Sequence, residues 1–278
     1  MAPRSATINV MVRAAEKAGR LLIRDFGEVE QLQVSRKGPA DFVSTADLKA
    51  ENAIKGELQK ARPEFGFLME ESGFSEGRDK GSRWIVDPLD GTTNFLHGLP
   101  HWAISIALER EGEIVSAVVY EPVRTEMFWA EKGQGCFLNA QRLRVSERRR
   151  LDDSLVATGI PFKGRGDHPA FLRQQTAVMA EVAGIRRFGS AALDLAYVAA
   201  GRYEGFWESG LSPWDIAAGI LLVSEAGGFV TEIAGGRNPL YGPDLLAANS
   251  HLHRPLSKLL VAANPKKATE APSGSPQR

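Results

Sequence analysis

The 278-residue chain has little of three things: cysteine, net charge and long apolar stretches. Its single cysteine, Cys136, can form neither an internal disulfide nor a thiolate metal cluster, which fits a reducing compartment. Lys plus Arg and Asp plus Glu both number 34, and this zero balance argues against charge-driven binding to nucleic acid or anionic membranes. The apolar runs are too short for a transmembrane helix, and the N-terminus has no signal-peptide pattern. We therefore expect a cytoplasmic protein without membrane contact or direct sequence-specific nucleic-acid binding.

What the chain does have is enough apolar material for a sizeable core, because 43% of its residues are hydrophobic. In the first part, apolar spacings of three and four predict helices over residues 6–26 and 47–59. Short apolar strands are expected at residues 66–69 and 84–86, with a polar, Gly-rich loop over residues 74–82.

Four strand-like runs separated by turns come next and predict an antiparallel meander, at residues 102–108, 114–120, 126–130 and 135–138. The second half then alternates in type, with strands at 154–158 and 203–207 and helices at 168–183, 190–201 and 216–226. Such alternation favours an α/β layer arrangement. We expect one domain over residues 1–263, with helices and an antiparallel sheet up to about residue 150 and an α/β half after it. The tail, residues 264–278, has almost nothing to bury and is predicted to be disordered.

Acidic residues stand where strands end and helices begin. Glu70 follows the strand at 66–69, and Asp87 and Asp90 follow the strand at 84–86. Asp47 and Asp215 lie at the starts of predicted helices. Oxygen ligands of this kind, without His or Cys among them, suit Mg²⁺ rather than zinc.

The stretch DPLDGTT at residues 87–93 has a spacing that suits a cation and a phosphate together. Two carboxylates three residues apart in a tight turn can share a cation, and a backbone carbonyl between them can add a ligand. Gly91 then lets the backbone approach closely, so that successive N–H groups can hold a phosphate.

Each acid also has a plain structural interpretation. Asp215 can complete a capping box with Ser212 as N-cap and Pro213 at the first helical position. Asp47 can cap its helix, Glu70 can belong to an exposed loop pair, and D-P-x-D-G is often a surface turn. Taken one at a time, the motifs leave both interpretations open.

Taken together, four stretches resemble the signatures of the inositol monophosphatase family. They are EES at residues 70–72, WIVDPLDGTTNF at 84–95, WDIAAG at 214–219 and EAGG at 225–228, in the order of the family. The run GSAALDLAYVAAGR at 189–202 is especially similar to the bacterial extragenic-suppressor branch. The resemblance covers about residues 8–260 and implies an αβαβα five-layer sandwich of the inositol monophosphatase and fructose-1,6-bisphosphatase type.

The same resemblance implies a role for individual residues. The ligands of two or three Mg²⁺ ions would be Glu70, Asp87, the Leu89 carbonyl, Asp90 and Asp215. The catalytic residues would be Glu70, Thr92 and Asp47, the last two matching the pair that polarises the attacking water. Substrate would bind at Asp90, Gly91, Thr92, Ser190, Ala191, Glu208 and Asp215, with Glu208 receiving substrate hydroxyl groups. Lys37 matches a basic residue near the site, and Met69 stands where the family commonly has glycine, a change expected to alter only local packing.

The family implies magnesium-dependent, lithium-sensitive hydrolysis of myo-inositol monophosphate by direct in-line attack of water, in a homodimer. The same scaffold resembles enzymes that act on fructose 1,6-bisphosphate, histidinol phosphate, NADP or 3′-phosphoadenosine phosphates, which remain alternatives. The extragenic-suppressor branch implies a different role, as a partner of RNA polymerase in ribosomal-RNA transcription. Arginines between residues 142 and 150 are predicted to be a solvated connection, and Arg148, Arg149 and Arg150 are the candidates for such a partner surface.

Overall fold

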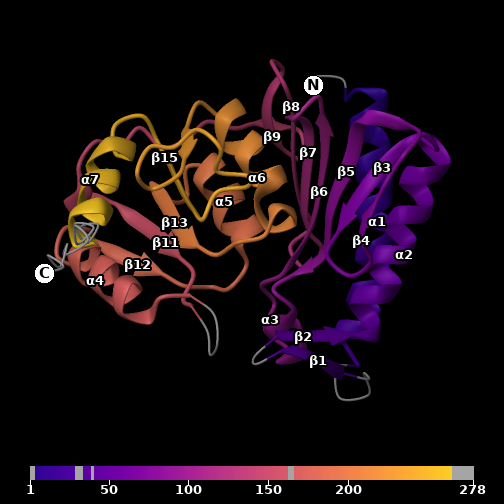
Figure 1. Cartoon of the computed structure of the whole chain (residues 1–278), viewed down its shortest axis with the longest axis horizontal. Coiled ribbons are helices and arrows are strands. Elements are labelled where there is room, and N and C mark those ends of the chain that lie inside the picture. Colours follow the sequence, from indigo (N-terminus) through magenta and orange to yellow (C-terminus); the bar gives the residue numbers. More distant parts are fainter. Residues whose placement is uncertain (1–3, 29–33, 39–40, 162–165, 265–278) are drawn as a thin grey trace, which may run out of the picture.

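The computed structural model describes residues 4–28, 34–38, 41–161 and 166–264. Two mixed sheets alternate with three helical layers (Figure 1). The outer pair on the first sheet is α1 (Ala6–Phe26) and α2 (Thr45–Ala61), the middle pair is α5 (Ala191–Ala199) and α6 (Pro213–Glu225), and the outer pair on the second sheet is α4 (His168–Met179) and α7 (His253–Ala263). This order confirms the predicted five-layer αβαβα sandwich.

The first sheet has eight strands in the order β10-β9-β8-β7-β6-β5-β3-β4. Neighbouring strands are antiparallel except for β3 and β5, which run parallel. The bounds are β3 (Phe65–Met69), β4 (Gly73–Ser75), β5 (Asp79–Asp90), β6 (Ala103–Arg110), β7 (Glu113–Glu121), β8 (Glu126–Glu131), β9 (Gly135–Leu138) and β10 (Gln141–Arg142). Strands β6 to β9 are the predicted antiparallel meander.

The second sheet has five strands in the order β12-β11-β13-β15-β14. Its central strand β13 is parallel to β11 and antiparallel to β15, so the carboxyl ends of β11 and β13 lie at the same edge. The bounds are β11 (Leu155–Thr158), β12 (Gly184–Arg186), β13 (Gly205–Ser209), β14 (Phe229–Thr231) and β15 (Asp244–Ala248). A separate hairpin of β1 (Val34–Gly38) and β2 (Asp41–Ser44), the short helix α3 (Thr92–Leu96) and a 3₁₀ turn at Leu151–Asp153 complete the described elements.

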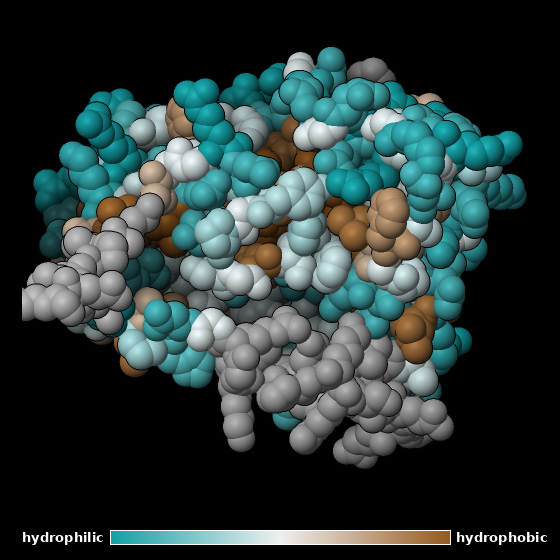
Figure 2. Space-filling model, viewed as in Figure 1, coloured by the Kyte–Doolittle hydropathy of each residue, from teal (hydrophilic) through white to brown (hydrophobic). Residues whose placement is uncertain are grey.

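Three apolar clusters fill the spaces between the layers. One joins α1 and α2 to the first sheet and includes Met11 and Trp84. The second lies between the two sheets around α5 and α6, with Leu195 and Leu222 fully buried. The third packs α4 and α7 against the second sheet around Trp207. The surface over these layers is mostly hydrophilic in the face seen in Figure 2, with apolar residues in small separate groups.

Local signals explain where the helices begin. Ser5 is the N-cap of α1, and its side chain accepts a hydrogen bond of 3.2 Å from the Ile8 amide. α6 starts with the capping box expected from the sequence, with Ser212 as N-cap, Pro213 in the first turn and Asp215 as the reciprocal acid. Each of these two helices therefore begins at a serine N-cap that stands directly before its first residue.

The expected loop over residues 74–82 is wrong, because β4 ends at Ser75 and β5 already begins at Asp79. β4 is the edge strand of the sheet, and the start of β5 pairs with β3 at mostly exposed or half-buried positions, so the apolar alternation of a buried strand is missing from both. The predicted helix 168–183 also ends earlier, at Met179, and is followed by β12. The predicted disordered tail falls, after residue 264, outside the described residues. Among the helices described, none is long and apolar enough to cross a bilayer.

Candidate active site

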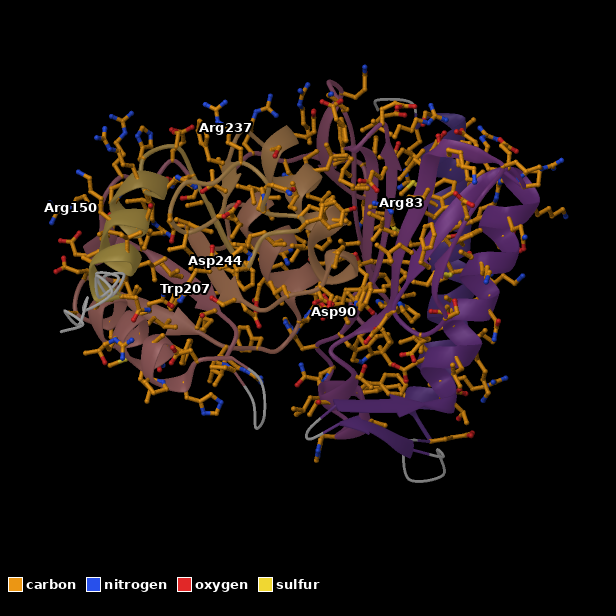
Figure 3. All side chains as sticks on the ribbon, viewed as in Figure 1. Arg83, Asp90, Arg150, Trp207, Arg237 and Asp244 are labelled. Carbon is orange, nitrogen blue, oxygen red and sulfur yellow. The ribbon has the colours of Figure 1, made fainter. Side chains whose placement is uncertain are left out.

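Strand ends of the two sheets come together at a cavity of about 300 Å³. It lies where the carboxyl ends of β3, β5, β11 and β13 approach the starts of α3, α5 and α6, and Asp90 is labelled there between the two halves in Figure 3. Of the residues predicted for the site, those lining the cavity are Glu70, Asp90, Gly91, Thr92, Ser190, Ala191, Glu208 and Asp215. Residues more than 100 positions apart are thus brought to one place.

Three predicted residues lie just behind this lining. Asp87 is 2% exposed, and its Oδ1 accepts a hydrogen bond of 2.9 Å from the Leu89 amide. Leu89 and Asp47 are buried as well. The side chain of Lys37 lies outside the described residues.

Gly91 follows directly after β5 in a left-handed conformation, with φ of +97°. A Cβ atom there would meet the His101 carbonyl oxygen at 3.1 Å and Trp102 Cβ at 3.2 Å, so both conformation and space require glycine. Thr92 starts α3 directly afterwards. Its Oγ1 lies 3.1 Å from Asp47 Oδ1 and 3.0 Å from the Leu89 carbonyl oxygen, both of which can accept its proton.

Asp90 connects the first sheet to the middle helices. Its Oδ2 accepts hydrogen bonds from Ser190 Oγ, at 2.6 Å, and from the Ala192 amide, at 2.7 Å. Ser190 is also the N-cap of α5, and its Oγ accepts a hydrogen bond from the Leu193 amide. The helix start that the sequence predicted thus also fixes a predicted site acid.

Asp215 likewise caps a helix and lines the cavity. Its Oδ2 accepts a hydrogen bond of 2.7 Å from the Ser212 amide, as the capping box requires. The same side chain lines the cavity together with Asp90 at the end of β5. Capping holds the carboxyl group in place without removing it from the site.

The electrostatics of the site are those of carboxyl groups forced together. Burial raises the pKa of Asp87 well above its ordinary value, and the charges of Glu70, Asp90 and Asp215 raise it further. Burial also raises the pKa of Asp215, again with repulsion from Asp90 and Glu70. For Asp90, burial raises the pKa to about 6, although hydrogen bonds from Ser190 and the α5 amides oppose the shift. Burial and the Asp90 charge raise the pKa of Glu208 to about 8.

Such a cluster fits a hard divalent cation by its donor chemistry. Glu70, Asp87, Asp90 and Asp215 offer only carboxylate oxygens, the ligands that Mg²⁺ prefers, and their mutual repulsion is what a cation would relieve. The described residues do not present three such side chains already closed into a metal cage. Asp90 and Asp215 each commit one oxygen to a donor of the protein instead, at Ser190 and Ser212.

Sequence reasoning gave no site role to several residues that line the cavity, among them Gly159, Arg187 and Asp194. Asp194 stands inside the motif at 189–202, where a single acid on a predicted helix looks like a solvated position, yet it is 1% exposed. Arg187 lies in the loop before α5, and no pattern in that loop indicated a site. Gly159 follows directly after β11, and its close contact with the Glu208 carboxyl group, 49 positions later in the sequence, is visible only in the fold.

Comparison with known proteins agrees with this geometry. Residues 4–268 match the family described as the inositol monophosphatase family. An inositol-1-monophosphatase from Mesorhizobium japonicum is 60% identical over 255 residues, which are 92% of this chain and 96% of the relative. The Nus factor SuhB of Escherichia coli K12 is 48% identical over 242 residues, or 87% and 91% of the two chains.

A solved structure has the same fold. The crystal structure of the extragenic suppressor protein SuhB from Bartonella henselae is 59% identical and superimposes with a TM-score of 0.90, covering 92% of this chain and 98% of that one. The family match, the sequence identity and the shared fold agree with one another. The chain belongs to the inositol monophosphatase family.

Proposed function

We propose that this protein is an inositol-1-monophosphatase, which hydrolyses myo-inositol monophosphate to myo-inositol and phosphate. Relatives that are 54–60% identical over at least 91% of the chain carry that name. The observation that carries the proposal is the convergence of Glu70, Asp90 and Asp215 on one cavity beside the Gly91–Thr92 turn. Buried acids and backbone amides at one point suit a phosphate monoester bound through divalent cations.

We propose Mg²⁺, in two or three sites, held by Glu70, Asp87, the Leu89 carbonyl, Asp90 and Asp215. When bound, Mg²⁺ supplies Lewis-acid chemistry, because it lowers the pKa of water and neutralises charge on the phosphoryl oxygens. The protein's own contribution is to hold these acids in place through the donors at Ser190 and Ser212.

The remaining roles follow from position. Thr92 Oγ1, which faces Asp47, orients the attacking water and passes on its proton, and Glu70 holds the same water. The Gly91 and Thr92 amides bind the phosphate. Ser190 and Ala191 border the substrate at the α5 start, and the Glu208 carboxyl group receives hydroxyl groups of the leaving alcohol.

The test is a phosphate-release panel with Mg²⁺, with and without Li⁺. It compares myo-inositol 1-phosphate with fructose 1,6-bisphosphate, histidinol phosphate, NADP and 3′-phosphoadenosine 5′-phosphate. We expect inositol phosphate to be the best substrate and Li⁺ to inhibit. Dominant activity on any other member of the panel would make that compound the substrate in place of inositol phosphate. No phosphate release from any member would refute the proposed phosphatase function.

A second candidate function, as a partner in transcription, is favoured by the relatives named Nus factor SuhB. The three candidate arginines are exposed, and Arg148 also pairs with Glu204 and Arg150 with Asp152. The exposed Arg149 makes no ion pair among the described residues. Pull-down of RNA polymerase by the Asp87→Asn variant would support this role independently of catalysis, and no association of the unmodified protein would exclude it.

We also propose that the protein forms a homodimer, as the family implies. Light scattering on the purified chain would measure its mass. A monomer at all concentrations tested would contradict the proposal.

A further inference from the structure

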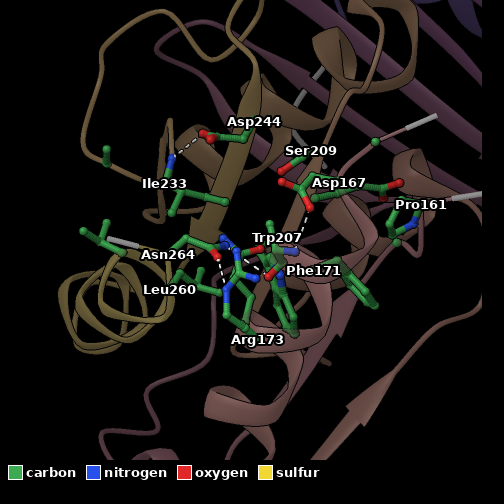
Figure 4. A pocket seen from close by; sticks show the side chains of 17 residues that line it. Pro161, Asp167, Phe171, Arg173, Trp207, Ser209, Ile233, Asp244, Leu260 and Asn264 are labelled. Atoms are coloured by element: carbon green, nitrogen blue, oxygen red, sulfur yellow. Dashed lines mark hydrogen bonds between the residues drawn. The ribbon is translucent and has the colours of Figure 1, made fainter. Parts of the chain in front are cut away.

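Glu208 lies at the junction of two cavities. The active-site cavity shares Gly159 and Glu208 with a larger cavity of about 520 Å³, which Trp207 and Ser209 also line (Figure 4). Because side chains alternate along β13, Trp207 packs toward α4 and α7 while Glu208 faces the acids of the site. The carboxyl group of Glu208 therefore lies where the two cavities adjoin, and its position depends on the residues around it.

The Glu208 carboxyl group occupies the space where any residue other than glycine at position 159 would have its Cβ atom. A Cβ atom on residue 159 would lie 1.9 Å from Glu208 Cδ and Oε1, and 2.1 Å from Oε2. Gly159 is not among the glycines with a left-handed φ, so its backbone would accept alanine. Glycine is required here for the space that the carboxyl group occupies, and not for the shape of the chain.

The backbone on both sides of this contact cannot move apart easily. Thr158 pairs with Trp207 in the parallel ladder between β11 and β13. In addition, Thr158 Oγ1 donates a hydrogen bond of 2.8 Å to the Trp207 carbonyl oxygen. A methyl group at residue 159 would consequently displace the flexible end of Glu208 and leave the strands in place.

Asp194 is the second group that lies with Glu208 at the active-site cavity. It is 1% exposed, and neither of its carboxyl oxygens has a hydrogen-bond partner in the described structure. Glu208 is the charged group that acts on it most strongly, ahead of Asp90 and Arg187. A buried carboxyl group without a donor destabilises a fold, so its presence beside the cavity calls for a reason other than stability.

We propose that Gly159 and Asp194 are positioning residues that set leaving-group specificity by fixing the Glu208 carboxyl group. Gly159 leaves the space that the Glu208 carboxyl group occupies, and Asp194 is the buried acid that lines the active-site cavity together with it. Arg187, which lines the same cavity, attracts both acids. The site would thereby favour a polyol leaving group, whose hydroxyl groups donate to Glu208, over a leaving group without hydroxyls. This inference rests on the proposed phosphatase function.

The first experiment compares two phosphate esters in the Gly159→Ala variant. With myo-inositol 1-phosphate, kcat/KM should fall about tenfold or more, chiefly through KM, because a hydrogen bond to a charged group is misplaced. With p-nitrophenyl phosphate, which has no leaving-group hydroxyl, kcat/KM should stay unchanged. Gly56→Ala is the matched control, since no atom lies within 4 Å of a Cβ at that position of α2. Equal losses on both esters, or none, would overturn the proposal.

The second experiment asks whether the effect passes through Glu208. In the Glu208→Ala background, adding Gly159→Ala should cause no further loss on inositol phosphate, because the group to be displaced is gone. A further loss of the full size seen in the unmodified background would mean that Gly159 acts on something else.

Asp194→Asn is the third variant. The amide keeps the shape but removes the acidic group and offers a fixed donor to Glu208, so inositol phosphate should again lose more than p-nitrophenyl phosphate. The melting temperature should not fall, because no hydrogen bond to the carboxyl group is lost. Glu204→Gln is the contrast: this buried acid accepts a hydrogen bond from the Leu155 amide and pairs with Arg148, so the variant should melt earlier with unchanged preference.

The unmodified protein separates the two levels of failure. If it hydrolyses neither ester, the proposed function fails and this inference fails with it. If it hydrolyses inositol phosphate and the ratio between the two esters is the same in all variants, only the positioning role is refuted.

Discussion

Thr92 Oγ1 lies 3.1 Å from Asp47 Oδ1, a contact that joins the start of α3 to the first turn of α2. Asp47 is fully buried, so its carboxyl group is held in one place and shielded from solvent. The hydroxyl group thus faces the cavity with an acceptor directly behind it. This contact is the basis for the proposal that the attacking water loses its proton through the Thr92 hydroxyl group to the Asp47 carboxylate.

Asp47→Asn should therefore lower turnover while leaving substrate binding largely intact. The amide can still accept a hydrogen bond, but it cannot take up a proton, and kcat should fall about 100-fold with KM changed little. Steady-state phosphate release at saturating Mg²⁺ measures both constants. Glu57→Gln, on the same helix but half-buried, away from the cavity and paired with Lys17, is the control and should match the unmodified protein. A kcat for Asp47→Asn close to that of the control would refute the proton path.

The raised pKa of Glu208 predicts how the metal-free protein responds to pH. Burial raises this pKa from 4.5 to about 8, so the folded state holds its proton more tightly than the unfolded chain does. The group costs no stability below the unfolded pKa, and the cost grows as pH rises until it is complete above about 8. Its full size is on the order of a few kcal/mol.

Thermal melting in EDTA should accordingly show the midpoint falling between pH 5 and pH 8. Glu208→Gln cannot ionise, and its melting midpoint should fall less than that of the unmodified protein throughout this range. The same slope in the unmodified protein and in Glu208→Gln would contradict the assignment.

How much of the site was visible in the sequence depends on how local each signal is. The spacing of Asp87 and Asp90 is written in the sequence, but the tight turn expected there is wrong, because residues 87–90 are the end of β5, with a register shift between the two acids. Asp215 was predictable as a capping acid, since a capping box spans only four residues. That one cavity would collect them followed from the family resemblance, because no local pattern relates residue 90 to residue 190.

The unpredicted residues depend on contacts between distant strands. Gly159 matters through Glu208, 49 positions later, and its conformation is one that most residues can adopt. Asp194 looks like an ordinary acid on a helix and becomes unusual only because α5 is packed between two sheets. In the fold, the same reason explains why the edge strand β4 was taken for a loop while α1 was predicted to the residue.

Removal of the cation should affect activity and stability together. We expect EDTA to abolish turnover, and Mg²⁺ at about 100 times its Kd to stabilise the folded protein by about 2.7 kcal/mol. Asp87→Asn removes one of the mutually repelling charges, so it should not lower the melting point in EDTA, yet it should lose most of the gain on adding Mg²⁺. Differential scanning fluorimetry with and without metal measures both. Full activity in EDTA, or an unchanged Mg²⁺ gain in the variant, would argue against a magnesium cluster at this place.

We further expect residues 1–263 to unfold as one unit. The cluster around α5 and α6 includes residues of both sheets, and Asp90 of the first sheet accepts hydrogen bonds from Ser190 and Ala192 in the second half. Neither half can keep that cluster without the other, which favours a single transition in calorimetry. Leu195→Ala, at a fully buried position between the sheets, should lower stability by about 2–5 kcal/mol and shift the whole transition. Two separate transitions, only one of which moves in the variant, would mean that the halves are independent domains.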